Sequence, residues 1–181
     1  VSSAASDVYK RQELSAAHAQ AVQYLIYQCN ALADFFETTK TGYDEAHAIP
    51  FFTSYSEGEQ PLPFVISNNF LEGMTTEPLA GLLSAKGVEE VLPAELLDAL
   101  RQLLEKISET EAMHRDFAIR CQEEFSPDHN ASVFYDAEAT DLRENFQWFP
   151  NTLYTLGLAL DDCHTETGSV LAMLGVQQTK E

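Results

Sequence analysis

Three histidines, His18, His114 and His164, occupy positions where the helical pattern of the chain predicts apolar side chains. Glu111 and Asp161 precede two of them by three residues. Residues three apart on a helix share a face, so each carboxylate can be directed at the same ion as its imidazole. Helical bundles hold iron, manganese or zinc with histidine and carboxylate ligands from facing helices. The sequence therefore predicts a buried metal site with these five residues as candidate ligands.

Carboxylate–histidine pairs also arise by chance, and two interpretations stay open. Asp44 and His47 repeat the spacing in a connecting segment, so three of the five histidines follow a carboxylate by three residues. Acidic residues fill 29 of 181 positions, so roughly one such pair is expected by chance. The two-metal bundles need further glutamates, for which Glu144 and Glu166 are candidates. The alternative is that each histidine is a hydrogen-bonded core residue and no cofactor binds.

Haem is a variant of the metal prediction, because one core histidine can serve as its axial ligand. Phe146, Trp148 and Phe149 would then line a flat pocket. The chain has no Cys-x-x-Cys-His sequence, which excludes covalent attachment of haem. Residues 174–179, LGVQQT, are similar to a stretch in the indoleamine dioxygenases, which are helical haem proteins. That similarity covers six residues and assigns no family.

Apolar residues recur every three or four positions in the segments that must position these side chains. The clearest segment is 93–125, in which Glu111 and His114 lie on or beside the apolar face. The predicted helices are residues 13–39, 76–85, 93–125, 136–149 and 151–174. These helices predict an all-α, up-down bundle of about four main helices with short extra helices. We expect a long irregular connection, the first crossover of the bundle, after residue 42. Within it, residues 61–73 fit either a short helix or an extended segment.

Several residues are expected to set the helix ends. Thr41-Gly42 predicts the end of the first helix, and Gly175 predicts the end of the last one. Thr76 is a candidate cap for the short helix, with Pro78 at an early position. Pro150 either starts the last helix or kinks a continuous one.

The first twelve residues are expected to be a non-native tail. Residues 2–12, SSAASDVYKRQ, match the in-frame translation of a transposase adapter used in sequencing libraries. We therefore expect native sequence to begin near Glu13, inside a helix, so that the chain is a fragment whose own N-terminus is missing. Residues 13–181 suit one helical-bundle domain.

The charge of the chain favours some partners and disfavours others. The net charge is −19, and without the first twelve residues it is −20. Such a surface repels nucleic acid and anionic membranes and attracts basic proteins or cations. No segment is long and apolar enough to predict a membrane span. The three cysteines, Cys29, Cys121 and Cys163, are predicted to be buried free thiols, which indicates a reducing compartment such as the cytoplasm.

Three functions are compatible with these observations. The first is a bundle with a metal or haem site, and whether it is an enzyme stays open because no phosphate loop or nucleophile motif is present. The second is a non-enzymatic acidic interaction protein, such as an immunity protein or an adaptor, that binds a basic protein. The third is a structural piece of a larger protein. The sequence does not indicate the oligomeric state.

The metal prediction has a direct test. Protein purified without chelators should retain a stoichiometric amount of iron, manganese or zinc in elemental analysis, and haem would add a Soret band. A His114→Ala variant should lose the metal, whereas His129→Ala should keep it, because His129 lies outside the candidate set. Protein without metal and without a Soret band would contradict the prediction.

Overall fold

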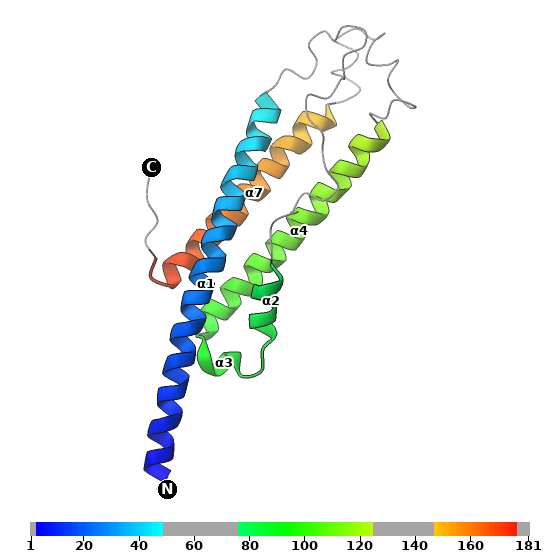
Figure 1. Ribbon diagram of the computed structural model, residues 1–181. Helices are drawn as coiled ribbons and strands as arrows, with labels where there is room; N and C mark the ends of the chain where they lie inside the picture. Colours follow the sequence, from blue (N-terminus) through cyan, green and yellow to red (C-terminus); the bar gives the residue numbers. More distant parts are fainter. Residues whose placement is uncertain (1–2, 49–75, 125–146, 177–181) are drawn as a thin grey trace, which may run out of the picture. The chain divides into compact units, whose positions relative to one another are not determined.

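The computed structural model describes residues 3–48, 76–124 and 147–176, which are helical with short turns and contain no strand. The helices are α1 (Ser3–Ala48), α2 (Glu77–Ser84), α3 (Val88–Val91), α4 (Ala94–Glu124) and α7 (Trp148–Met173) (Figure 1). The predicted all-α helical bundle is confirmed. Residues 61–73, and all but the end of the expected helix 136–149, lie outside the described residues.

The chain forms two compact units. The first comprises residues 1–36, 74–107 and 163–181, and the second comprises residues 37–73 and 108–162. Since α1, α4 and α7 run through both, each unit contains a piece of every long helix. The expectation of one domain for residues 13–181 stays a prediction.

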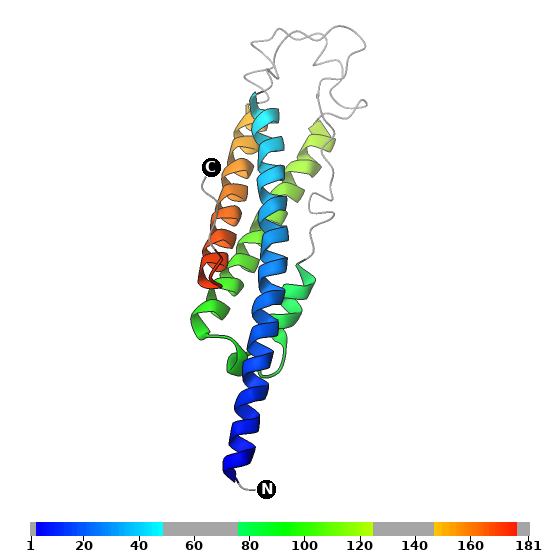
Figure 2. The ribbon, with the colours of Figure 1, turned by 60° about the vertical axis from the view of Figure 1, so that its left-hand side comes forward.

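Within the first unit, successive helices alternate in direction in the order α1, α2, α4, α7 (Figures 1 and 2). The single turn α3 lies at the reversal between α2 and α4. Every helix of this unit contributes buried apolar side chains, so its core is built from all of them. These side chains are Leu25, Cys29, Leu32, Phe36, Leu79, Val88, Leu92, Leu96, Leu97, Leu100, Leu103, Ile107, Cys163, Val170 and Leu171.

The second unit has a smaller described core in which polar residues interrupt the apolar ones. Thr110 and His114 of α4 are buried beside the apolar residues of the same helix, at 5% and 3% exposure. The buried apolar side chains are Phe117, Ala118, Phe149, Leu153, Leu156 and Leu160. The sequence prediction that polar side chains enter the apolar face of α4 is therefore confirmed for these two positions.

The predicted end of the first helix at Thr41-Gly42 is wrong, because α1 continues to Ala48. The Thr41 hydroxyl donates to the Glu37 carbonyl at 3.0 Å, a bond that the helical backbone permits. A glycine in a helix interior costs only about 1 kcal/mol relative to alanine. A helix of 46 residues tolerates that cost, so glycine alone did not predict its end.

The predicted end of the last helix at Gly175 is confirmed. Gly175 adopts a positive φ of 85°, which an L side chain would strain. Its N–H donates to the Ala172 carbonyl at 3.0 Å, and the Val176 N–H donates to the Leu171 carbonyl at 2.9 Å. This pair of bonds is a Schellman motif, which satisfies the last carbonyls of α7. Pro150 lies in the first turn of α7, where its missing N–H costs no helical hydrogen bond.

The short helix α2 begins and ends close to its predicted limits. Thr76 is the N-cap residue, which confirms the predicted position of the cap. Its side chain, however, makes no capping hydrogen bond. Pro78 is in the first turn as expected. Gly87 has a positive φ of 83° at the start of α3, a turn of helix that the sequence did not predict. This glycine lets the chain reverse between α2 and α4 within a few residues.

Truncation of Leu100 tests the core of the first unit. Its side chain is fully buried on α4. Leu100→Ala should lower the free energy of unfolding by about 2–5 kcal/mol, because it removes buried methyl groups and leaves a cavity. The same change at Leu158, whose side chain is 49% exposed on α7, should cost less than about 1 kcal/mol. Urea unfolding of both variants measures the difference, and equal losses would contradict the assigned core.

Candidate functional site

His114 and Glu111 lie one turn apart on α4 in the second unit. The His114 side chain is only 3% exposed, as expected for a residue on the buried face. Glu111 is half-buried, and its carboxylate oxygen Oε1 accepts from Arg115 Nη2 at 3.1 Å. The Glu111 carboxylate therefore forms an ion pair with Arg115 on a partly exposed surface.

Asp161 and His164 lie on α7 with the expected spacing of three residues. Asp161 is exposed, and His164 is half-buried. The Asp161 carboxylate is therefore in contact with water rather than in the core. Glu166, a further carboxylate considered for the site, pairs with Lys106 at 3.3 Å.

His18 is exposed, so the expectation that it lies on a buried face is wrong. The first buried residue of α1 is Leu25, two turns further along the helix. The His18 ring instead lies beside α3, where its Nδ1 is 2.9 Å from the Val91 carbonyl oxygen. A carbonyl can only accept, so Nδ1 carries the proton and donates. His18 thus ties α1 to the end of α3.

No group of three or more histidine, cysteine, aspartate or glutamate side chains that could hold a metal ion occurs among residues 3–48, 76–124 and 147–176. The five predicted ligands differ in exposure, and only His114 is fully buried. The metal site therefore stays a prediction, with His114 as the residue that best matches it.

The aromatic residues expected to line a haem pocket contact one another. The Trp148 and Phe149 rings meet edge to face at 5.9 Å, and Phe117 lies 5.5 Å from Phe149 and 6.0 Å from Trp148. The Arg120 guanidinium stacks over the Trp148 ring at 4.1 Å, a cation–π contact. Phe146 lies outside the described residues. The rings of Phe117, Trp148 and Phe149 therefore pack against one another within the second unit.

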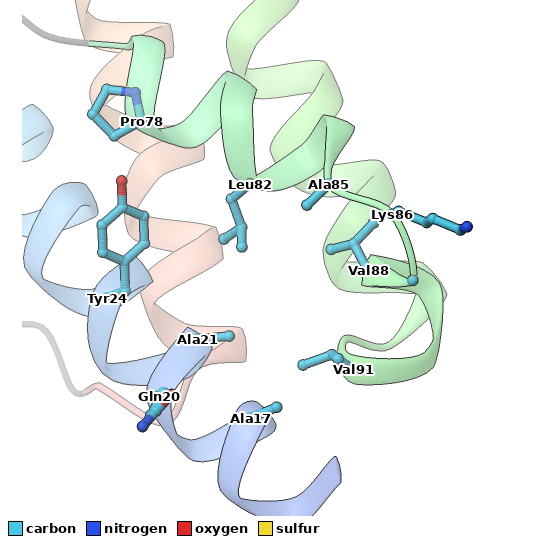
Figure 3. A pocket seen from close by; sticks show the side chains of 11 residues that line it. Ala17, Gln20, Ala21, Tyr24, Pro78, Leu82, Ala85, Lys86, Val88 and Val91 are labelled. Carbon is cyan, nitrogen blue, oxygen red and sulfur yellow. The ribbon is translucent and has the colours of Figure 1, made fainter. Parts of the chain in front are cut away.

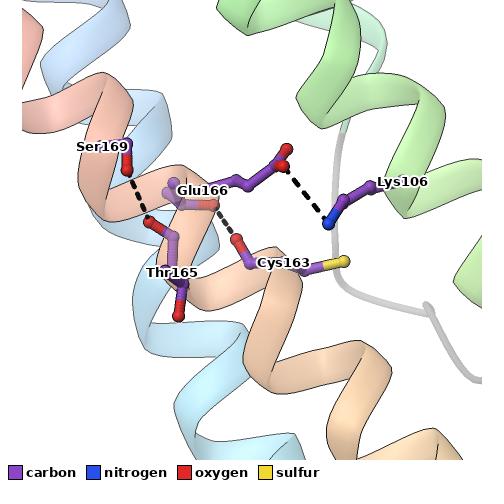
Figure 4. A network of polar contacts seen from close by, with 6 residues as sticks. Lys106, Cys163, Thr165, Glu166 and Ser169 are labelled. Carbon is purple, nitrogen blue, oxygen red and sulfur yellow. Dashed lines mark hydrogen bonds and ion pairs between the residues drawn. The ribbon is translucent and has the colours of Figure 1, made fainter.

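Figure 4 shows an ion pair between α4 and α7 in the first unit and hydrogen bonds within α7. The Lys106–Glu166 ion pair joins the two helices across a partly exposed surface, with side chains 39% and 31% exposed. Such a pair contributes at most about 1 kcal/mol. The buried Thr167 hydroxyl donates to the Cys163 carbonyl at 2.7 Å, which satisfies its hydrogen-bonding group inside the helix.

Two cysteines are buried and free, as predicted: Cys29 and Cys163. The Cys121 side chain lies outside the described residues. Burial raises the pKa of the Cys29 thiol from 9.0 to about 11. The thiolate is the reactive form of cysteine, so Cys29 is inert near neutral pH.

An apolar cleft opens between α1, α2 and α3 in the first unit (Figure 3). Its volume is about 550 Å³. Ala17, Ala21 and Tyr24 form the α1 wall, and Leu82 and Val91 reach toward it from the opposite side. The complete lining consists of Ala17, Gln20, Ala21, Tyr24, Pro78, Leu82, Ala85, Lys86, Gly87, Val88 and Val91.

Buried side chains and one hydrogen bond fix the helices that form the cleft. Leu79 of α2 and the lining residue Val88 of α3 are buried, at 0% and 4% exposure, and anchor these two helices in the core of the first unit. The His18–Val91 hydrogen bond ties α3 to α1 next to the lining residue Ala17. The other lining residues, such as Leu82, Val91 and Tyr24, are half-buried or exposed. They present apolar surface that residues 3–48, 76–124 and 147–176 leave uncovered.

Sequence reasoning missed the cleft because its walls come from separate segments and α3 was not predicted. One local signal pointed to it. Ala17 and Ala21 are one turn apart on α1, so small side chains leave a shallow face between larger residues. Gly87 marks the reversal that brings α3 back beside this face.

No protein-family model, curated protein or solved structure matches the chain. Among the described helices, none combines the length and the apolar character needed to cross a membrane.

The Cys29 thiol predicts a pH dependence of stability. Because its pKa is raised in the folded state, its contribution is fully present below about pH 9 and is lost as the pH rises to about 11. The loss should reach at most about 3 kcal/mol. Cys29→Ala should remove this component, so its unfolding free energy should fall less steeply over the same range in urea titrations. Parallel pH profiles for the variant and the parent would contradict the assignment.

Proposed function

We propose that the chain is a non-enzymatic interaction protein that binds a basic protein partner, as an immunity protein or an adaptor does. The observation that supports this proposal is its excess of carboxylates on the surface. The chain has 29 acidic and 10 basic residues, so most carboxylates lack a basic residue with which to pair. The exposed ones include Glu13, Asp34, Glu37, Glu77, Glu89, Glu90, Glu95, Asp98, Glu105, Glu109, Asp116, Glu123, Asp161 and Asp162.

These carboxylates occur on every described long helix, so the negative potential is not confined to one short segment. A field of one sign steers an oppositely charged protein to the surface and accelerates association. The same field disfavours nucleic acid and anionic lipid. The cytoplasm, where free thiols such as Cys29 persist, is the compartment that we propose for this function.

A second candidate function rests on His114. It is a buried histidine with the Glu111 carboxylate one turn away, which is the spacing of a metal ligand pair, and a metal there would compete with Arg115 for this carboxylate. Iron, manganese or zinc binding there, or haem ligation by His114, is the alternative proposal. The elemental analysis described above distinguishes it from the binding function.

The binding proposal predicts salt-sensitive capture of basic proteins. The immobilised chain should enrich proteins with pI above about 9 from a lysate at about 50 mM salt and release them at about 500 mM, because salt screens exposed charges. A variant with Asp34→Asn, Glu37→Gln, Glu105→Gln and Glu109→Gln should capture less, since it removes charge at exposed positions. Mass spectrometry measures the pI distribution of the bound proteins. A distribution equal to that of the input would contradict the proposal.

A further inference from the structure

We infer that the apolar cleft between α1, α2 and α3 is the docking site for the apolar face of a basic amphipathic helix. This inference rests on the proposed function, because it names the surface by which the basic partner is bound. It follows from three properties of the cleft: its dimensions, its lining and the charge around it.

The length of the cleft matches two turns of a helix. Ala17 and Tyr24 lie seven residues apart on α1, which corresponds to about 10 Å along the helix axis. A partner helix laid along this wall would place side chains at positions i, i+3 or i+4, and i+7 against the cleft. The volume of about 550 Å³ leaves room for the two or three side chains that such a helix would direct into the cleft.

The lining suits a helix more than a flat or strongly polar ligand. Ala17 and Ala21 let a second backbone approach α1 closely, because their side chains end at the β-carbon. Leu82 and Val91 face this wall from the other side and offer half-buried apolar contacts. Tyr24, 37% exposed at one end, supplies an aromatic ring with a hydroxyl that can bond to a polar residue at the helix edge.

The charge around the cleft selects a basic partner. Glu77 directly precedes the lining residue Pro78, and Glu89 and Glu90 lie between the lining residues Val88 and Val91. All three glutamates are exposed. Among the lining residues, Lys86 alone carries a full positive charge, and its side chain extends away from the cleft in Figure 3. These exposed carboxylates belong to α2 and α3, which also supply lining residues, and with the net charge of −19 they favour a partner helix that carries lysine or arginine beside its apolar face.

The test uses two fluorescent peptides of about 18 residues, long enough to form a helix on binding. Both contain only lysine and leucine in equal number. One places the leucines on a single helical face, and the other scatters them around the helix. Fluorescence anisotropy at about 50 mM salt should show at least about tenfold tighter binding of the amphipathic peptide, because only its leucines can enter the cleft together.

Variants of the chain locate the binding site. Ala21→Leu fills the cleft without changing charge and should weaken the amphipathic peptide about tenfold. Ala19→Leu is the matched control, because Ala19 is exposed on the same helix outside the lining, and its effect should stay within about twofold. Glu89→Gln with Glu90→Gln should weaken binding and lower its salt dependence. Circular dichroism and urea unfolding verify that the variants fold.

The outcomes separate this inference from the proposed function. If neither peptide binds at low salt, both fail. If the two peptides bind equally and Ala21→Leu has no effect, binding to a basic partner stands and the cleft inference is overturned. If Ala21→Leu abolishes self-association in sedimentation, or binding of a small apolar dye, without changing peptide affinity, the occupant is a second copy or a small ligand and the inference is likewise overturned.

Discussion

The burial of the apolar face of α4 is the interaction on which the first unit depends. Leu96, Leu97, Leu100, Leu103 and Ile107 are each at most 4% exposed, and buried residues of α1, α2 and α7 contribute to the same unit's core. Removing such side chains from water stabilises by about 1.5–3 kcal/mol each. This gain must offset the repulsion among the carboxylates of the chain. The net charge is −19, because the 10 basic residues are too few to neutralise the 29 acidic ones. The charge consequently lies on the outer helix faces, where water screens it.

Helix positions in this protein could be predicted from periodicity, whereas some helix ends could not. Residues 93–125 were expected to be helical, and α4 spans Ala94–Glu124, because its apolar repeat is long and regular. Gly175 ended α7 as expected because a positive φ there completes a cap. Gly42 likewise predicted a helix end, but α1 continues past it to Ala48. The residue type alone does not tell whether the backbone leaves the helical conformation at a glycine.

The candidate metal ligands show why sites are harder to predict than helices. A three-four repeat tells which face of a helix a residue occupies, but not whether another helix covers that face at that height. His114 is covered and His18 is not, although both continue an apolar repeat. The cleft could not be predicted because no repeating sequence pattern marks it. Its walls combine α1 with α2 and α3, segments more than 50 residues apart whose pairing leaves no periodic signal.

The hydrogen bond from His18 to the Val91 carbonyl joins two residues that are 73 positions apart in the sequence. Val91 is part of the cleft lining, whereas His18 is not. The separation between α1 and α3, and with it the width of the cleft, therefore depends on a side chain outside the lining. A substitution at position 18 would change the shape of the cleft without altering any residue that a ligand in it would contact.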